Sequence, residues 1–206
     1  ACLRGVAQAV CQVCVWLLSG PAAPSPFTME CVVPSVAGEC PGVDCMLEGR
    51  LWMGPASPAL DTPQRLVGIG ISHVVNATKD APCQFPDLFE YLRVPIADDP
   101  DEPIATYLQE ALEFVRHALD AGGRVYVHCH AGVSRSGAIA IFCVMRLQGA
   151  SLREAYNHVV ARRGSVQPNI GFFAVLVDAE RGAQPSYSLK EYCQDTLNAD
   201  FAAGVF

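Results

Sequence analysis

Hydrophobic positions along the chain fall into two alternating patterns, short continuous runs and longer stretches with helical spacing. The short runs lie at residues 47–53, 73–77, 91–95 and 124–128, and we expect β-strands there. Gly49 lies in the middle of the first run, so that run is predicted to form a strand pair or hairpin.

Apolar residues recur at intervals of three and four in further segments, which predicts helices. These segments are residues 62–69, 104–121, 136–148, 151–163 and a last one started by Pro168. The segment 136–148 is apolar on nearly every face, which indicates a buried central helix. Ser151 and Glu154 form a capping box. The Gly54–Pro58 stretch, with two prolines, is interpreted as a break after the hairpin.

The alternation of strands and helices predicts an α/β fold. We expect a central, mainly parallel twisted sheet flanked by helices on both faces. Ligands of such sheets bind at the carboxyl ends of the strands, so candidate site residues are sought there.

Composition fits one domain with extra residues at both ends. The chain has 206 residues, of which 51% are hydrophobic and 17% charged, enough for a sizeable core. We predict a domain at residues 44–184, between a poorly ordered extension and linker at 1–43 and a tail at 185–206 that carries no motif. The net charge of −7, without a basic stripe, argues against a nucleic-acid partner.

The first 43 residues allow several interpretations. Residues 6–18 are mostly apolar, too short for a transmembrane helix, and share features with signal peptides. Residues 1–43 form either a poorly ordered extension or a targeting or membrane-anchoring segment. Apart from the apolar stretch at residues 6–18, no feature of the sequence favours membrane association. Cys11 and Cys14 have the spacing of a metal or redox pair, but no second pair stands at zinc spacing. Prolines between residues 21 and 41 indicate a linker.

Candidate chemistry concentrates in residues 125–137. A strand leads into Cys129, a short loop with Gly132 and Arg135 follows, and a helix begins. Such a loop directs backbone N–H groups inward at the positive end of a helix dipole, which makes an anion site. A cysteine there has its pKa lowered from about 8.5 into a range of roughly 3.5–7.5. A thiolate beside a phosphate-binding arginine predicts phosphoryl transfer through a cysteinyl-phosphate.

The segment from His128 to Ser136 resembles the His-Cys-x5-Arg-Ser signature of the protein tyrosine phosphatase superfamily. It is most similar to the small, atypical dual-specificity phosphatases. Further stretches resemble parts of that domain in the same order: residues 51–55, 73–78, 93–98, 155–157, 162–163 and 167–172. The resemblance covers about residues 45–181 and implies a cysteine-phosphatase-like fold.

The resemblance also implies roles for single residues. Cys129 is the nucleophile, Arg135 binds phosphate, and Asp98 is the general acid and then the base. Ser136 donates a hydrogen bond to the sulfur, and Asn169 supports the loop. The phosphate-binding backbone N–H groups belong to His130, Ala131, Gly132, Val133, Ser134 and Arg135. No metal or other cofactor is implied.

Several of these residues also have plainer interpretations. His128 either tunes the thiolate or ties the strand end in place, and His130 is expected at the rim as a specificity residue. Asp99, in the same acidic loop, is the alternative acid to Asp98, although an acidic run is usually a solvated surface.

Two further pairs of residues carry open alternatives. Arg162 and Arg163 bind a second anionic group of the substrate or favour a helix C-terminus. Cys83 and Cys143 are weak candidates for redox partners of Cys129.

The implied function is a cysteine-dependent phosphatase that hydrolyses phosphotyrosine and phosphoserine or phosphothreonine in phosphorylated protein partners. The interior of the loop carries no lysine, which disfavours lipid substrates, and there is no Trp-Pro-Asp segment. The alternatives are a non-protein substrate (a phosphorylated glucan, a nucleic-acid end or a lipid phosphate) and a phosphoprotein-binding pseudophosphatase. A thiolate enzyme needs a reducing compartment, so we expect the chain in the cytoplasm and also allow the nucleus. Phosphorylated protein substrates imply a role in signalling. The scattered cysteines do not form a secreted disulfide framework.

Overall fold

The computed structural model describes residues 42–181 of the chain. The apolar stretch at residues 6–18, the pair Cys11 and Cys14, and the tail lie outside the described residues. The domain boundaries proposed for residues 43–44 and 184–185 therefore stay predictions.

A five-stranded sheet forms the centre of the fold. Its strands are β1 (Asp44–Leu47), β2 (Leu51–Gly54), β3 (His73–Asn76), β4 (Glu90–Arg93) and β5 (Val125–His128). They lie in the order β1-β2-β5-β3-β4. β1 and β2 pair antiparallel as the expected hairpin, and the other three pairings are parallel. The prediction of a mainly parallel sheet is thus confirmed.

The register of the parallel strands brings three strand ends together. Gly54 at the end of β2 and Asn76 at the end of β3 both pair with His128 at the end of β5. Loops that follow these strands therefore begin at one edge of the sheet. This edge is where an α/β sheet positions its functional residues.

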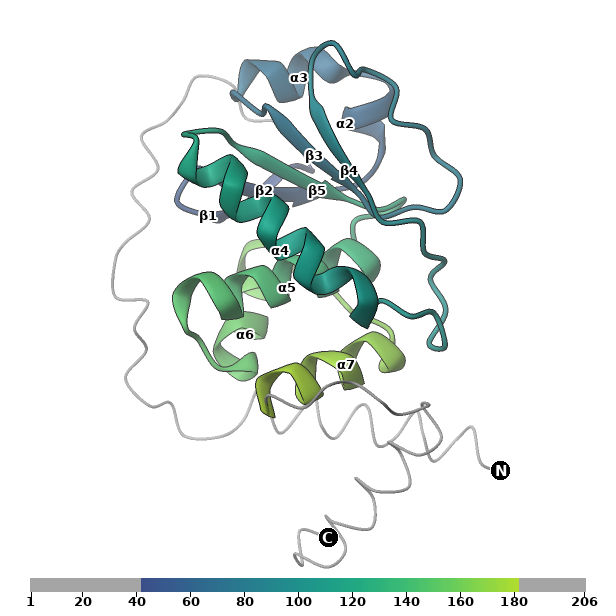
Figure 1. Cartoon of the computed structure of the whole chain (residues 1–206), viewed down its shortest axis with the longest axis vertical. Helices are drawn as coiled ribbons and strands as arrows, with labels where there is room; N and C mark the ends of the chain where they lie inside the picture. Colours follow the sequence, from purple (N-terminus) through teal and green to yellow (C-terminus); the bar gives the residue numbers. More distant parts are fainter. Residues whose placement is uncertain (1–41, 182–206) are drawn as a thin grey trace, which may run out of the picture.

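Helices cover both faces of the sheet, as expected. They are α2 (Ser57–Leu60), α3 (Pro63–Gly68), α4 (Ala105–Asp120), α5 (Arg135–Gln148), α6 (Leu152–Arg162) and α7 (Ile170–Arg181). Figure 1 shows α2 and α3 on one side of the sheet and α4 to α7 on the other. The layer formed by α4 to α7 is the thicker of the two.

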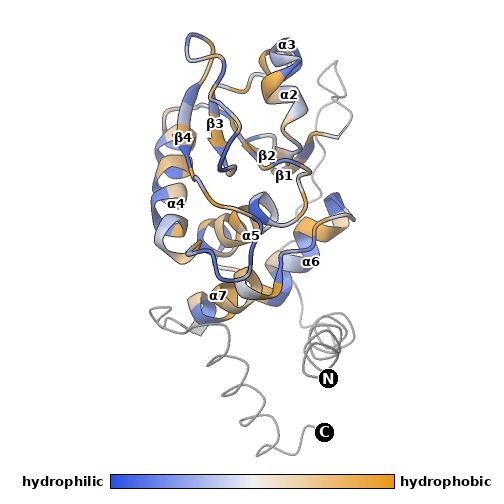
Figure 2. Cartoon of the chain, turned by 90° about the vertical axis from the view of Figure 1, so that its right-hand side faces the viewer, coloured by the Kyte–Doolittle hydropathy of each residue, from blue (hydrophilic) through white to orange (hydrophobic). Residues whose placement is uncertain are grey.

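Helix α5 is the buried helix that its composition predicts. Every residue from Arg135 to Met145 is buried, and in Figure 2 this helix is mostly hydrophobic while α4 carries both colours along its length. Packing around α5 restrains its first turn, because Ile139, Ile141 and Leu176 are fully buried in the same core. The residues that precede α5 thus rest on a rigid support.

One helix was not expected, and another begins at a different residue than expected. α2 occupies part of the stretch interpreted as a break, because Pro58 lies in the first turn, where a proline costs no backbone hydrogen bond. α7 begins at Ile170 rather than at Pro168. Asn169 sets that start, since its side-chain Oδ1 accepts a hydrogen bond from the backbone N–H of Phe172 at 3.0 Å. The capping box of Ser151 and Glu154 forms as expected.

His128 ends β5 as a buried and neutral histidine. Its Nδ1 donates to the carbonyl of Cys129 at 3.2 Å, and its ring stacks on Tyr126. Burial lowers the pKa of His128 to about 4; the nearby His130 and Arg135 act in the same direction, and the hydrogen bond to Cys129 opposes the shift. This placement fits the interpretation of His128 as a residue that ties the strand end in place.

The buried His128 predicts a specific loss of stability in acid. Between pH 6.5 and about 4 the unfolded chain binds a proton at this histidine that the folded chain excludes. The free energy of unfolding should therefore fall by about 3 kcal/mol as the pH drops through this window. In His128→Asn that contribution should be missing, which denaturant unfolding at a series of pH values would measure. His117→Asn, at an exposed position of α4, is the control; parallel stability curves for the chain and His128→Asn would contradict the prediction.

Candidate active site

The loop from Cys129 to Arg135, here called the anion loop, joins β5 to α5. Gly132 lies in the left-handed region with φ of 68°. A Cβ atom at Gly132 would overlap the backbone of Gly54 and Pro55, so only glycine allows the loop to pack on the end of β2. Ala56 also donates its backbone N–H to the carbonyl of His130 at 3.0 Å. The loop is thus fixed from the side of β2.

Hydrogen-bond donors converge on the sulfur of Cys129. The residue is 1% exposed. Its Sγ accepts from the backbone N–H of Gly132 at 3.3 Å and from the hydroxyl of Ser136 at 3.2 Å. Ser136 belongs to the first turn of α5, so the positive end of the helix dipole faces the same region.

These donors favour the thiolate of Cys129. Burial raises the pKa of this thiol, but hydrogen bonds from the Ser136 hydroxyl and from the backbone N–H groups of Ser136, Val133 and Gly132 outweigh it. The net pKa is lower than that of an ordinary cysteine. A buried thiolate with these partners is an activated nucleophile.

Arg135 begins α5 at the end of the anion loop, and its guanidinium is almost buried. The residue is 7% exposed, and Nη1 donates to the carbonyl of Ile96 at 3.3 Å. Nε lies 3.9 Å from Oδ2 of Asp98 and has no hydrogen-bond partner among residues 42–181. A buried donor of this kind fits an anionic ligand.

Asp98 reaches the anion loop from the acidic loop after β4. Its Oδ1 accepts from the hydroxyl of Ser134 at 2.6 Å and from the side-chain amide of Asn169 at 2.9 Å. Asp99 instead accepts from the backbone N–H of Asp101 at 2.9 Å. Of the two candidate acids, Asp98 is therefore the one that lies at the anion loop.

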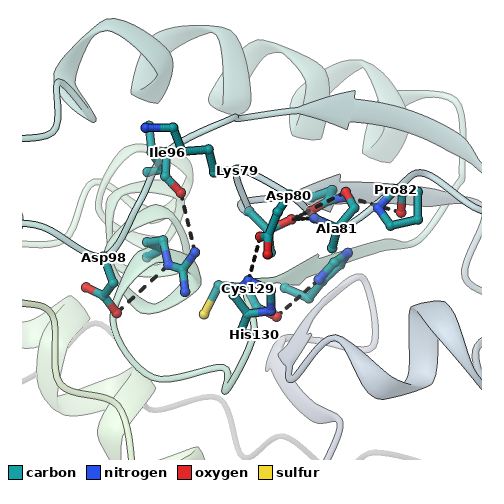
Figure 3. A network of polar contacts seen from close by, with 12 residues as sticks. Lys79, Asp80, Ala81, Pro82, Ile96, Asp98, Cys129 and His130 are labelled. Carbon is teal, nitrogen blue, oxygen red and sulfur yellow. Dashed lines mark hydrogen bonds and ion pairs between the residues drawn. The ribbon is translucent and has the colours of Figure 1, made fainter.

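His130 lies at the rim on the side away from Asp98. Its side chain is 48% exposed, and Nε2 lies 2.8 Å from Oδ1 of Asp80. The hydrogen bond from His130 lowers the pKa of Asp80. Asn76 orders the loop that carries Asp80, since its Nδ2 donates to the carbonyl of Ala81 at 3.0 Å. In Figure 3, Asp80 and Asp98 flank the sulfur of Cys129.

Some side-chain contacts of the site could not be expected from local patterns. Arg163 donates from Nε to the carbonyl of Gly132 at 2.7 Å and from Nη2 to the carbonyl of Ala131 at 3.1 Å. The Ser134 side chain and Asp80 also make contacts that no motif indicates. Their partners lie 31 to 50 residues away along the chain, so only the tertiary structure reveals them.

The remaining candidates lie in other surroundings. Arg162 donates to the carbonyl of His158 at 3.0 Å, within its own helix. Cys143 is buried in α5, where burial raises its pKa to about 12, so it does not supply a thiolate. Cys83 is half-buried and lies near the side-chain amide of Asn76 at 3.7 Å.

Neither a metal site nor a membrane span is found in the part of the chain that the structure describes. There, no three side chains of histidine, cysteine, aspartate or glutamate are grouped to bind a metal ion. No described helix is long and apolar enough to cross a bilayer.

Comparison with known sequences and structures agrees with this geometry. The profile of the dual specificity phosphatase catalytic domain matches residues 51–182. Human dual specificity protein phosphatase 14 is 38% identical over 144 residues, which cover 70% of this chain and 72% of that protein.

Two solved human structures are also similar to the chain. One is DUSP28, with a TM-score of 0.64 and 32% identity over 70% of this chain and 97% of the other. The other is a tyrosine phosphatase-like serine/threonine/tyrosine-interacting protein, with a TM-score of 0.64 and 35% identity. The match covers 68% of this chain and 95% of that protein. The matched profile spans well over half of the chain and includes the anion loop with its thiolate. The chain therefore belongs to the dual-specificity protein phosphatase family.

Proposed function

We propose that the chain hydrolyses phosphotyrosine and phosphoserine or phosphothreonine in proteins through a cysteinyl-phosphate on Cys129. The observation that supports this most directly is the set of hydrogen bonds on the Cys129 sulfur from Gly132 and Ser136. Arg135 and Asp98, whose side chains lie 3.9 Å apart, offer the cation and the proton donor that phosphoryl transfer requires.

In the first step the Cys129 thiolate attacks phosphorus and the bond to the substrate oxygen breaks. The inward N–H groups of the anion loop and the guanidinium of Arg135 stabilise the phosphoryl oxygens. Asp98 donates a proton to the leaving oxygen. Since Oδ1 of Asp98 accepts from Ser134 and Asn169, Oδ2 is the oxygen that carries this proton.

In the second step water attacks the phosphorus of the cysteinyl-phosphate. Asp98, now a carboxylate, accepts a proton from that water, and the bond between sulfur and phosphorus breaks. The hydroxyl of Ser136 stabilises the departing thiolate through its 3.2 Å hydrogen bond. Inorganic phosphate leaves, and the thiolate is restored.

We further propose a reducing compartment, the cytoplasm or the nucleus, and a role in signalling. Among the described residues, Cys83, Cys129 and Cys143 are free thiols. A thiolate nucleophile is active only while it stays reduced.

Replacing the nucleophile should abolish turnover. Cys129→Ser should lose on the order of a thousandfold or more in kcat toward an aryl phosphate, because a hydroxyl is a far weaker nucleophile than the thiolate. Release of inorganic phosphate measures this. Cys83→Ser is a matched control outside the site, and full activity of Cys129→Ser would rule out the thiolate mechanism.

Removing the acid should affect poor leaving groups most. Asp98→Ala should slow the hydrolysis of an alkyl phosphate by about 10²–10⁴-fold and that of an activated aryl phosphate much less. The neighbouring Asp99→Ala is the matched control and should keep both rates. An equal loss for both leaving groups would remove Asp98 from the role of acid.

The substrate class needs its own experiment. Matched peptides that carry phosphotyrosine, phosphothreonine or phosphoserine should all release phosphate, whereas a phosphorylated glucan, a phosphoinositide and a nucleic-acid 5′-phosphate should be poor substrates. Higher kcat/KM on one of these non-protein substrates would replace the protein assignment. Capture of phosphoproteins by Cys129→Ser, absent with free vanadate as competitor, would identify physiological partners.

A further inference from the structure

Arg163 binds the outer side of the anion loop. It follows α6, and its side chain is 12% exposed. Nε donates to the carbonyl of Gly132 at 2.7 Å, and Nη2 donates to the carbonyl of Ala131 at 3.1 Å. A guanidinium fork thus binds two successive peptide units of the loop.

The same two peptide units face the sulfur with their other ends. In a planar trans peptide the carbonyl of one residue points opposite to the N–H of the next. The Ala131 carbonyl therefore shares a peptide unit with the N–H of Gly132, which donates to the Cys129 sulfur at 3.3 Å. The Gly132 carbonyl shares one with the N–H of Val133, which also lowers the pKa of Cys129.

Arg163 is itself fixed by partners at the start of the domain. Nη1 donates to Oδ2 of Asp44 at 2.7 Å and to the carbonyl of Gly42 at 3.1 Å. These contacts leave the guanidinium committed to protein groups, which disfavours the alternative that Arg163 binds a second anion of the substrate. They also tie β1 to the anion loop across more than 80 residues of chain.

We propose that Arg163 is a positioning residue that orients and polarises the Ala131–Gly132 and Gly132–Val133 peptide units, so that their N–H groups point at the nucleophile and at the phosphoryl oxygens. This inference rests on the proposed function for its catalytic consequence, but its effect on the thiolate does not. Hydrogen bonds in a chain polarise one another, so a cation at the carbonyl end strengthens the N–H donor at the other end.

The chain provides a matched control for this role in Arg162. It precedes Arg163 directly, carries the same charge, and donates within α6 to the carbonyl of His158. Arg163→Ala and Arg162→Ala therefore remove the same charge from the same end of one helix. Arg163→Lys keeps the charge but offers a single ammonium where two carbonyls need a fork.

The decisive measurement is the rate at which iodoacetamide alkylates Cys129 across a pH series, followed on the Cys129 peptide by mass spectrometry. In Arg163→Ala the midpoint should rise by about one pH unit, and kcat/KM toward an aryl phosphate should fall about tenfold or more. The alkylation midpoint of Arg163→Lys should lie between those of Arg163→Ala and the unmodified chain. The midpoint of Arg162→Ala should match that of the unmodified chain. Asp44→Asn should give a smaller shift than Arg163→Ala.

The outcomes separate this inference from the proposed function. If Arg163→Ala lowers the melting temperature but leaves the alkylation midpoint unchanged, Arg163 only stabilises the fold and the inference is overturned. If the midpoint shifts while even the unmodified chain releases no phosphate from any substrate, the positioning role stands and the proposed function fails.

Discussion

A negative charge on a buried sulfur is the constraint on which the rest of the site depends. Burial of an ion without partners costs several kcal/mol, so Cys129 needs donors that replace water. The chain provides them from the backbone of Gly132 and Val133 and from Ser136. A backbone donor is directional only when its loop is rigid. The left-handed Gly132 packed on the end of β2 and the buried helix α5 both contribute that rigidity.

The surrounding loops are joined into one frame around the sulfur. The loop that carries Asp80 is ordered by Asn76 at the end of β3, while Asp98 comes from the acidic loop after β4. Lys79 and Glu102 connect these two loops through an exposed ion pair at 3.3 Å. Because exposed pairs contribute little stability, the buried contacts dominate the arrangement. The parallel register makes this frame possible, since it brings three strand ends to one edge.

Much of this arrangement follows from local sequence patterns. Apolar periodicity predicts the strands and the longer helices, and the segment from His128 to Ser136 predicts the anion loop, because each depends on neighbouring residues. The contact of Arg163 with backbone carbonyls is not predictable in this way. A carbonyl acceptor has no residue identity, so no pattern marks Ala131 or Gly132 as its partner. Helix α2 is not predictable from its two prolines, because a proline can begin a helix as well as interrupt one.

Asn169 shows how one small side chain limits what the sequence can become. Its oxygen caps α7 and its amide nitrogen donates to Asp98. Aspartate and serine are about equal to asparagine as helix caps. Aspartate at this position, however, would place a second carboxylate against Asp98, and serine is too short to reach both groups. The helix cap alone would accept several residue types at this position, but the cap and the contact with Asp98 together require asparagine. Substitution here is therefore constrained by a carboxylate 71 residues away in the chain.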